Sequence, residues 1–270
     1  MPLRLARNAT EPRLPSRAAF LALAVLVMTA PPPASAEPIT SFEGFPPGEN
    51  GVTLFRQPTF SGSTDRFLAR TPDLSVVTDE RASDGAQSLL VSWQFLPGQT
   101  DPWLRLTTFN APNLPNPALD LSLALQFDIF VPRATPDFYV TLGVRETGTP
   151  VPIGTNGGTV GSIEFVGATS LRGQTPIGRL IPEKDTWVTV SFEIPFEPVQ
   201  PFTGNGRLDV ARGVLEQLAF TPVSSSATGP YVIYLDNVRQ VAVVPEPGTA
   251  ALVASCLMPL GVAVLRRRRA

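Results

Sequence analysis

LSLALQFDIFV, at residues 121–131, is the stretch that decides the fold. Every odd-numbered position in it is apolar, whereas the polar residues Ser122, Gln126 and Asp128 all fall at even positions. Successive side chains of a β-strand point to opposite faces of the sheet, so this period of two predicts a strand with one buried face. An amphipathic helix would instead need an apolar period near 3.6 residues.

The same alternation recurs in two later stretches. Phe138–Arg145 and Trp187–Ile194 each carry apolar residues at every even position. An apolar side chain contributes about 1.5–3 kcal/mol when it becomes fully buried. We therefore expect one face of each strand to build a common core, and the other face to meet solvent or a ligand.

Clusters of prolines and glycines recur along the chain, and short apolar runs lie between them. The sequence contains no internal repeat. Regularly spaced short strands with turn residues between them are typical of an all-β sandwich. The sequence therefore predicts an antiparallel, all-β domain over residues 37–243. The expected strands are Ile39–Phe42, Gln87–Phe95, Leu104–Phe109, Ser122–Val131, Phe138–Arg145, Thr159–Val166, Trp187–Ile194, Val214–Thr221 and Tyr231–Val241.

Residues 1–36 have the pattern of a secretory signal peptide with a signal helix. Four arginines precede an apolar run at Ala18–Ala30, and the small residues Ala34 and Ala36 mark a cleavage site after Ala36. The alternative is a retained membrane anchor. A run of thirteen residues spans only about 20 Å as a helix, short of a ~30 Å hydrocarbon core, which favours cleavage.

The opposite end, residues 244–270, predicts a single transmembrane helix. An apolar run at 249–265 lies between a Pro-Glu-Pro motif and the cluster Arg266, Arg267, Arg268 and Arg269. The segment 248–265 would extend about 27 Å as a helix, just enough to cross a bilayer. By the positive-inside rule, the arginines keep their end in the cytoplasm. The plain alternative is an ordinary C-terminal anchor.

This order of motif, apolar span and arginine cluster resembles the PEP-CTERM protein-sorting signal. The resemblance implies that a membrane enzyme, exosortase, recognises Pro245, Glu246 and Pro247 and removes the helix with its arginines. These three residues would then be recognition residues and not catalytic ones. A similar tail is described as the C-terminal domain of certain ice-binding proteins. Such a tail is a sorting signal, and it does not imply that the protein binds ice.

Charge and composition exclude several classes of function for residues 37–243. The two ends hold eight of the 21 basic residues and two of the 23 acidic ones, which leaves the middle at a net charge of −8. Nothing in that balance suggests a nucleic-acid partner. The chain has no histidine, and its one cysteine, Cys256, lies in the apolar tail. His-based catalysis and His-ligated metals are therefore excluded, and a metal here would be a hard cation such as calcium, held by oxygens.

Catalysis would require a pair of carboxylates or a serine with an unconventional base. The acids Asp128, Glu146, Glu164 and Glu193 lie in or near expected strands, but their spacing selects no pair. We therefore assign no catalytic residue and expect a protein that is not an enzyme.

Four short motifs resemble carbohydrate-binding jelly-roll domains of the galactose-binding-like type. They are SFEGF at 41–45, SDGAQSLLV at 83–91, TWVTVSF at 186–192 and YLDNV at 234–238. The resemblance implies a jelly-roll topology and a structural calcium held by Glu43, by oxygens near Asp84 and by Asp236. The alternative is that Glu43 and Asp236 are solvated or bonded to the backbone.

Sugar binding needs exposed aromatic faces on a rigid support. Trp103, Tyr139 and Trp187 fall on the polar sides of their strands, and Tyr231 lies at a strand edge, so these four are the candidate stacking residues. The alternative is that they cap the ends of the sandwich.

The sequence as a whole predicts an exported protein, anchored in the inner membrane before processing and afterwards part of the cell envelope or extracellular matrix. Its expected partners are signal peptidase, exosortase, the membrane and an extracellular polysaccharide. Two alternatives remain open: a purely structural surface protein without glycan affinity, and a glycan-active hydrolase.

Overall fold

The computed structural model describes residues 36–109, 111–152 and 161–243. In these residues the regular structure is β-strand, apart from three 3-10 turns at Pro58–Phe60 (η1), Asp65–Phe67 (η2) and Ile194–Phe196 (η3). The expected signal peptide and the sorting tail lie outside the described residues. No helix in the described ranges is long and apolar enough to cross a membrane.

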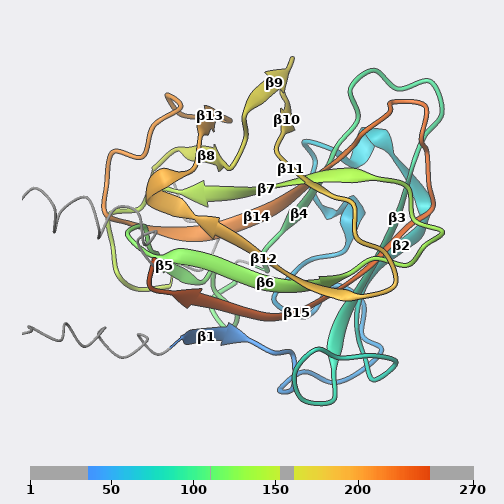
Figure 1. Ribbon diagram of the computed structural model, residues 1–270, viewed down its shortest axis with the longest axis horizontal. Helices are drawn as coiled ribbons and strands as arrows, with labels where there is room; N and C mark the ends of the chain where they lie inside the picture. The colour runs from blue at the N-terminus through green and yellow to red at the C-terminus, as the bar shows by residue number, and fades with distance from the viewer. Residues whose placement is uncertain (1–35, 110, 153–160, 244–270) are drawn as a thin grey trace, which may run out of the picture. The chain divides into compact units, whose positions relative to one another are not determined.

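A six-stranded antiparallel sheet contains the first and last strands. Its strands follow the order β12-β6-β15-β3-β2, and β1 pairs with the free part of β15 (Figure 1). Their bounds are β1 Glu37–Thr40, β2 Leu68–Thr78, β3 Ser88–Phe95, β6 Ala124–Phe130, β12 Trp187–Glu193 and β15 Tyr231–Val241.

A seven-stranded antiparallel sheet forms the second layer. It has the order β13-β8-β7-β14-β4, with β11 added to β7 and β5 added to β14. The bounds are β4 Leu104–Thr107, β5 Ala118–Asp120, β7 Phe138–Arg145, β8 Ile163–Val166, β11 Arg179–Ile181, β13 Val199–Pro201 and β14 Arg212–Pro222. A separate hairpin, β9 (Ser170–Arg172) with β10 (Thr175–Ile177), lies between β8 and β11 in the chain.

The core lies between the two sheets and follows the alternation of the sequence. Leu125, Phe127 and Ile129 of β6 are completely buried, as the stretch 121–131 predicted. Trp93 of β3 reaches the other sheet, where its ring lies 5.3 Å from that of Phe220 in β14. The prediction of an antiparallel all-β fold is therefore confirmed for the described residues.

One long strand departs from the prediction. β2, eleven residues long, was not expected because its sequence LARTPDLSVVT contains a proline and several polar residues. The strand is at the edge of its sheet, and its register with β3 shifts between Leu68 and Asp73, around Pro72. An edge strand with a bulge tolerates proline because no neighbouring strand requires its missing N–H.

Candidate functional site

The outer face of the seven-stranded sheet has a buried floor of small and polar residues beneath aromatic side chains. Two rows of paired residues form this floor: Thr107, Gln217 and Gly143 in one, and Ala219 and Thr141 in the next. Gly143 leaves room for the side chain of Gln217, because a Cβ at position 143 would overlap Gln217 Cγ. We call this floor, with its aromatic walls, the trough.

Three aromatic side chains form the walls of the trough. The ring of Trp103, next to β4, lies 5.5 Å from the ring of Phe165 in β8 and 5.7 Å from that of Phe202. Phe165 and Phe202 are 5.0 Å apart. Because β14 and β7 lie between β4 and β8, the rings meet above the small residues of those two middle strands.

Three polar groups of the floor are buried and have no hydrogen-bond partner among the described residues. They are the hydroxyls of Thr107 and Thr141 and the amide nitrogen of Gln217. Leaving such a group unpaired costs about 1–3 kcal/mol, and native proteins contain few of them. The three groups lie on adjacent rows of the floor.

A buried ion-pair network closes one end of the trough. Glu216 is fully buried and accepts from Arg105 Nη2 at 3.1 Å and from Arg145 Nε at 3.0 Å. A β-bulge between Leu215 and Gln217 turns Glu216 and Gln217 to the same outer face. Burial lowers the pKa of the Arg105 guanidinium, while Glu216 opposes that shift.

Residues 202–209, which we call the strap, place Phe202 on the wall of the trough and then follow the edge of the sheet along β8 and the end of β7. Glu164 is buried and accepts the N–H groups of Asn205 at 2.7 Å and Gly206 at 3.0 Å. The carboxylate of Glu146 accepts the N–H of Asp209. Burial raises the pKa of Glu164, the strap N–H groups oppose the rise, and the negative charges of Glu146 and Asp209 add to it. Hydrogen bonds to the carboxylates of Glu164 and Glu146 therefore hold the strap in place.

The hairpin of β9 and β10 covers the other end of the same face. Thr221 of β14 donates its hydroxyl to Pro176 O at 2.8 Å, and Arg172 lies 3.7 Å from the carboxylate of Asp101. Strap and hairpin together keep the floor of the trough out of contact with solvent.

Two of the four aromatic candidates lie on this face. Trp103 is on the outer side of the seven-stranded sheet, where the alternation placed it, but only 3% of it is exposed because Phe165 and Phe202 pack on it. Trp103 is therefore a buried wall and not the exposed platform that was expected. Tyr139 is half-buried and pairs with Thr221 and Leu180.

The other two candidates lie elsewhere. Trp187 is half-buried on the outer face of the six-stranded sheet, with its ring 5.7 Å from Phe130. Tyr231 is wholly buried and stacks on Trp93 at 5.0 Å, so the expectation of a surface platform there is wrong. Its hydroxyl donates to Ala227 O, which lets the ring enter the core without an unpaired polar atom.

Sequence reasoning missed Phe165, Phe202, Glu216 and Gln217. The adjacent polar pair Glu216-Gln217 interrupts the apolar run of β14, and that interruption was the available signal for a bulge. Nothing local marks Phe202, because it becomes a wall residue only when the strap folds back over the sheet.

The residues expected to hold calcium form a different kind of site. Asp236 accepts the N–H groups of Ser83 at 2.7 Å, Asp84 at 3.0 Å and Asn237 at 2.7 Å. Glu43 accepts those of Ala86 and Gln87 at 2.7 and 2.8 Å. Within the described ranges no cluster of acidic or cysteine side chains could hold a metal ion. The backbone alternative left open by the sequence is the one observed.

We expect the melting temperature of the protein to be the same in excess EDTA as in excess calcium. Backbone N–H groups already bind Glu43 Oε1 and both oxygens of Asp236, so neither carboxylate depends on a cation to hold its loop in place. Differential scanning calorimetry measures both conditions directly. An increase of several degrees with calcium would contradict the assignment.

The four acids considered for catalysis do not form an open pair. Glu146 and Glu164 approach the same segment, but both are engaged in holding the strap. Asp128 lies on the six-stranded sheet, where it accepts from Thr189 and Ser83 at 2.6 and 2.8 Å. Glu193 is exposed at the end of β12.

Comparisons with known proteins bear on the chain as a whole. No family model and no curated protein matches it. Among solved structures, it is similar to the family 11 carbohydrate-binding module of the cellulosomal cellulase Lic26A-Cel5E of Clostridium thermocellum, with 12% identity and a TM-score of 0.45 over 79% of this chain and 98% of that one.

Two further similarities are weaker. The family 30 carbohydrate-binding module of the cellulosomal cellulase Cel9D-Cel44B of Clostridium thermocellum has 14% identity and a TM-score of 0.37, over 72% of this chain and 95% of that one. The CBM22-1 xylan-binding domain of Xyn10C from Paenibacillus barcinonensis has 15% identity and a TM-score of 0.30, over 73% and 99%. No residue of the trough is transferred from these proteins.

Proposed function

We propose that this chain is an exported cell-envelope protein whose β-sandwich binds a polysaccharide in the trough without cleaving it. The observation that carries the proposal is the set of three buried, unpartnered polar groups, Thr107, Thr141 and Gln217, beneath aromatic walls. A sugar ring has an apolar face for the aromatic side chains and hydroxyls for the polar floor.

The chemistry of the floor suits hydroxyl groups better than charged ones. A threonine hydroxyl donates and accepts, and the amide nitrogen of Gln217 donates, so each can bond a sugar hydroxyl. Charged groups are already present as the closed network of Glu216 with Arg105 and Arg145. A neutral, polyhydroxylated ligand therefore satisfies the floor without disturbing that network.

Ligand entry requires the strap to move. Phe202 is half-buried and packs against Trp103, Phe165 and Arg105. The guanidinium carbon of Arg105 lies 5.2 Å from the centre of the Phe202 ring. The strap contains Gly204 and Gly206, the latter with a φ of 77° that favours glycine. In the proposal, the ligand displaces Phe202 and takes over its contacts with the walls.

Export and processing are part of the same proposal. The signal peptide would be cut after Ala36, and exosortase would act at Pro245, Glu246 and Pro247. β1 begins at Glu37, directly after the expected cleavage position, and pairs there with Gln240 of β15. That pairing supports a mature chain that starts with an ordered strand.

The test is the double variant Thr107→Val and Thr141→Val. Each change removes an unpartnered hydroxyl at nearly constant volume, so we expect equal or higher stability. Polysaccharide affinity should fall about tenfold or more, because two hydrogen bonds of about 1 kcal/mol each are lost. Calorimetric titration of the full chain in detergent, after a glycan-array screen, measures the affinity.

Thr221→Val is the matched control on the same sheet. Its hydroxyl donates to Pro176 O, so this variant should lose about 1 kcal/mol of stability. Unchanged affinity in the double variant would contradict the site. Failure of the wild type to bind any glycan would favour the purely structural alternative, and release of reducing sugar would favour the hydrolase.

A further inference from the structure

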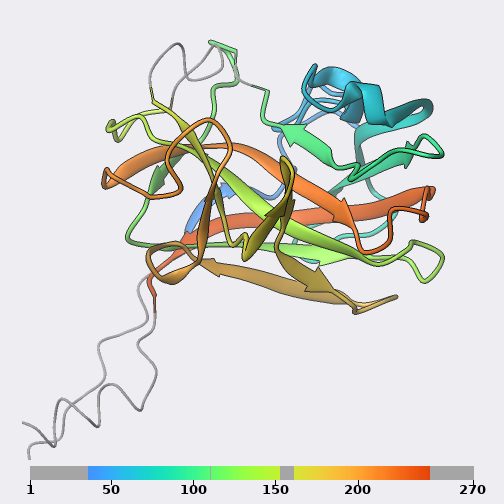
Figure 2. The same cartoon turned by 90° about the horizontal axis from the view of Figure 1, so that it is seen from above.

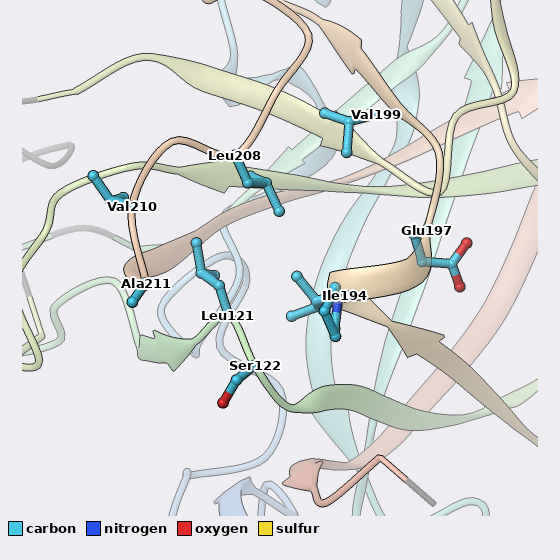
Figure 3. Close-up of a pocket in the computed structure, with 9 residues that line it drawn as sticks. Leu121, Ser122, Ile194, Glu197, Val199, Leu208, Val210 and Ala211 are labelled. Carbon is cyan, nitrogen blue, oxygen red and sulfur yellow. The ribbon is translucent and has the colours of Figure 1, made fainter. Parts of the chain in front are cut away.

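An apolar cleft of about 410 Å³ opens at one end of the sandwich. The residues that line it are Leu121 and Ser122 before β6, Ile194 and Pro195 of η3, Glu197, Val199, Leu208, Val210 and Ala211. Figure 3 shows Leu121, Ile194 and Leu208 directed into the same space, whereas the carboxylate of Glu197 is turned away. That carboxylate accepts from Arg179 Nη2 at 2.9 Å, so its charge is engaged outside the cleft.

Apolar side chains also project around the cleft. Phe196, which follows the lining residues of η3, has 74% of its surface exposed, and Val210 has 38%. Exposed apolar side chains that adjoin an apolar cleft mark a surface that can be buried against a partner or a membrane. We call the cleft together with these two side chains the apolar end.

The described chain stops at this same end. Val241 of β15 pairs with Ala124 of β6, which in turn pairs with Glu193 of β12, so the three strands end or begin together. Gln240 is hydrogen-bonded to Asp120, the residue next to Leu121 of the cleft. Both views show β15 ending and β1 beginning on one side of the sandwich (Figure 1, Figure 2).

The length of the chain beyond Val243 limits how far the apolar end can be from the membrane. Five peptide steps lead from Val243 to Gly248, where the predicted span begins, and they reach at most about 18 Å. While that span is inserted, Val243 therefore lies within about 18 Å of the bilayer surface.

Charge decides which lipids suit this surface. Arg212 is paired with Asp120 at 2.8 Å, Arg179 with Glu197, and Glu193 and Asp209 add negative charge. An anionic membrane needs a cluster of unpaired basic residues, which this end lacks among its described residues. Apolar insertion into a neutral interface is the mode that remains.

We propose that the apolar end docks on a zwitterionic phospholipid bilayer and inserts Phe196 into its interface. This inference rests on the membrane-spanning role of the tail in the proposed function. Docking would hold the sandwich against the membrane in the interval before the tail is removed.

The experiment places a polarity-sensitive fluorophore on the full chain in vesicles of phosphatidylethanolamine and phosphatidylcholine. Cys256→Ser removes the native thiol, and Phe196→Cys or Val210→Cys provides the label site. Val223→Cys is the control, because Val223 is 40% exposed but lies beside Asp137, at the start of β7 and the opposite end of the sandwich. Circular dichroism checks that each labelled chain is folded.

Labels at 196 and 210 should shift to the blue and be quenched several-fold more than the label at 223 by nitroxide lipids. Equal quenching at all three positions would overturn the docking. A label at 196 that is shielded but not quenched by nitroxide lipids would also overturn it, and would indicate cover by the tail or a second copy. Extraction of the chain from the vesicles at alkaline pH would show that the tail does not anchor it in the bilayer, which would overturn the docking. This result is separate from glycan binding, which is measured by titration.

Discussion

Replacing Glu216 with alanine is expected to lower the free energy of unfolding by about 3–5 kcal/mol. The carboxylate is fully buried and is the shared acceptor of Arg105 and Arg145, both of which are largely buried. Removing it leaves two guanidinium groups without their counter-charge where water cannot easily reach them. The loss should therefore greatly exceed that of an ordinary ion pair.

Urea denaturation of the variant measures the effect. Arg133→Ala is the control, because the Arg133 guanidinium bonds Asp185 at 2.9 Å in an exposed pair and the backbone bond between the two residues remains. Exposed pairs contribute about 0–1 kcal/mol, so the free energy of unfolding of the control should change little. Glu216→Gln keeps an acceptor for one arginine and should fall between the two. A loss below 1 kcal/mol for Glu216→Ala would refute the network as described.

Replacing Asp236 with alanine should cost about 3 kcal/mol, because three backbone N–H groups lose a charged, buried acceptor. Those donors belong to the turn at Ser83 and Asp84 and to Asn237, which has a positive φ of 48°. The carboxylate thus holds the turn before β3 against the last strand. Thermal melting at neutral pH measures the loss.

The pH dependence of Asp236 has a definite sign. Burial raises the pKa of Asp236, and the backbone N–H groups oppose that rise. A raised pKa means that the folded protein holds the proton more tightly than the unfolded chain. The stability of the wild type relative to Asp236→Asn should therefore be greatest below about pH 4 and decline as the pH rises through the shifted value. The opposite slope would show that the hydrogen bonds outweigh burial.

The alternation of the sequence predicted the faces of strands well. The stretch 121–131 supplies β6 with its buried row, and Trp103 lies on the outer side of its sheet as expected. β2 was not predicted because Pro72 and its polar neighbours are compatible only with a strand at the edge of a sheet. The sequence of a segment does not show whether the segment will lie at an edge or in the middle of a sheet. The strands of three residues, such as β5 and β13, are too short to show a period.

The trough could be predicted only in part for a related reason. Trp103 and Tyr139 were identified because a strand directs alternate side chains outward. Phe202 belongs to a loop whose place depends on the carboxylates of Glu146 and Glu164, from two other strands. Whether an outward ring is exposed or covered depends on such distant segments.

By itself, the sequence determined the all-β class, the face on which each regular strand is apolar, and the exclusion of histidine and thiol chemistry from residues 37–243. Only the tertiary structure decided that Tyr231 enters the core, that Phe202 covers Trp103, and that Asp236 accepts hydrogen bonds from backbone N–H groups. The reason is that the direction of a side chain follows from its own backbone. Burial and partners are set when segments far apart in the chain come together.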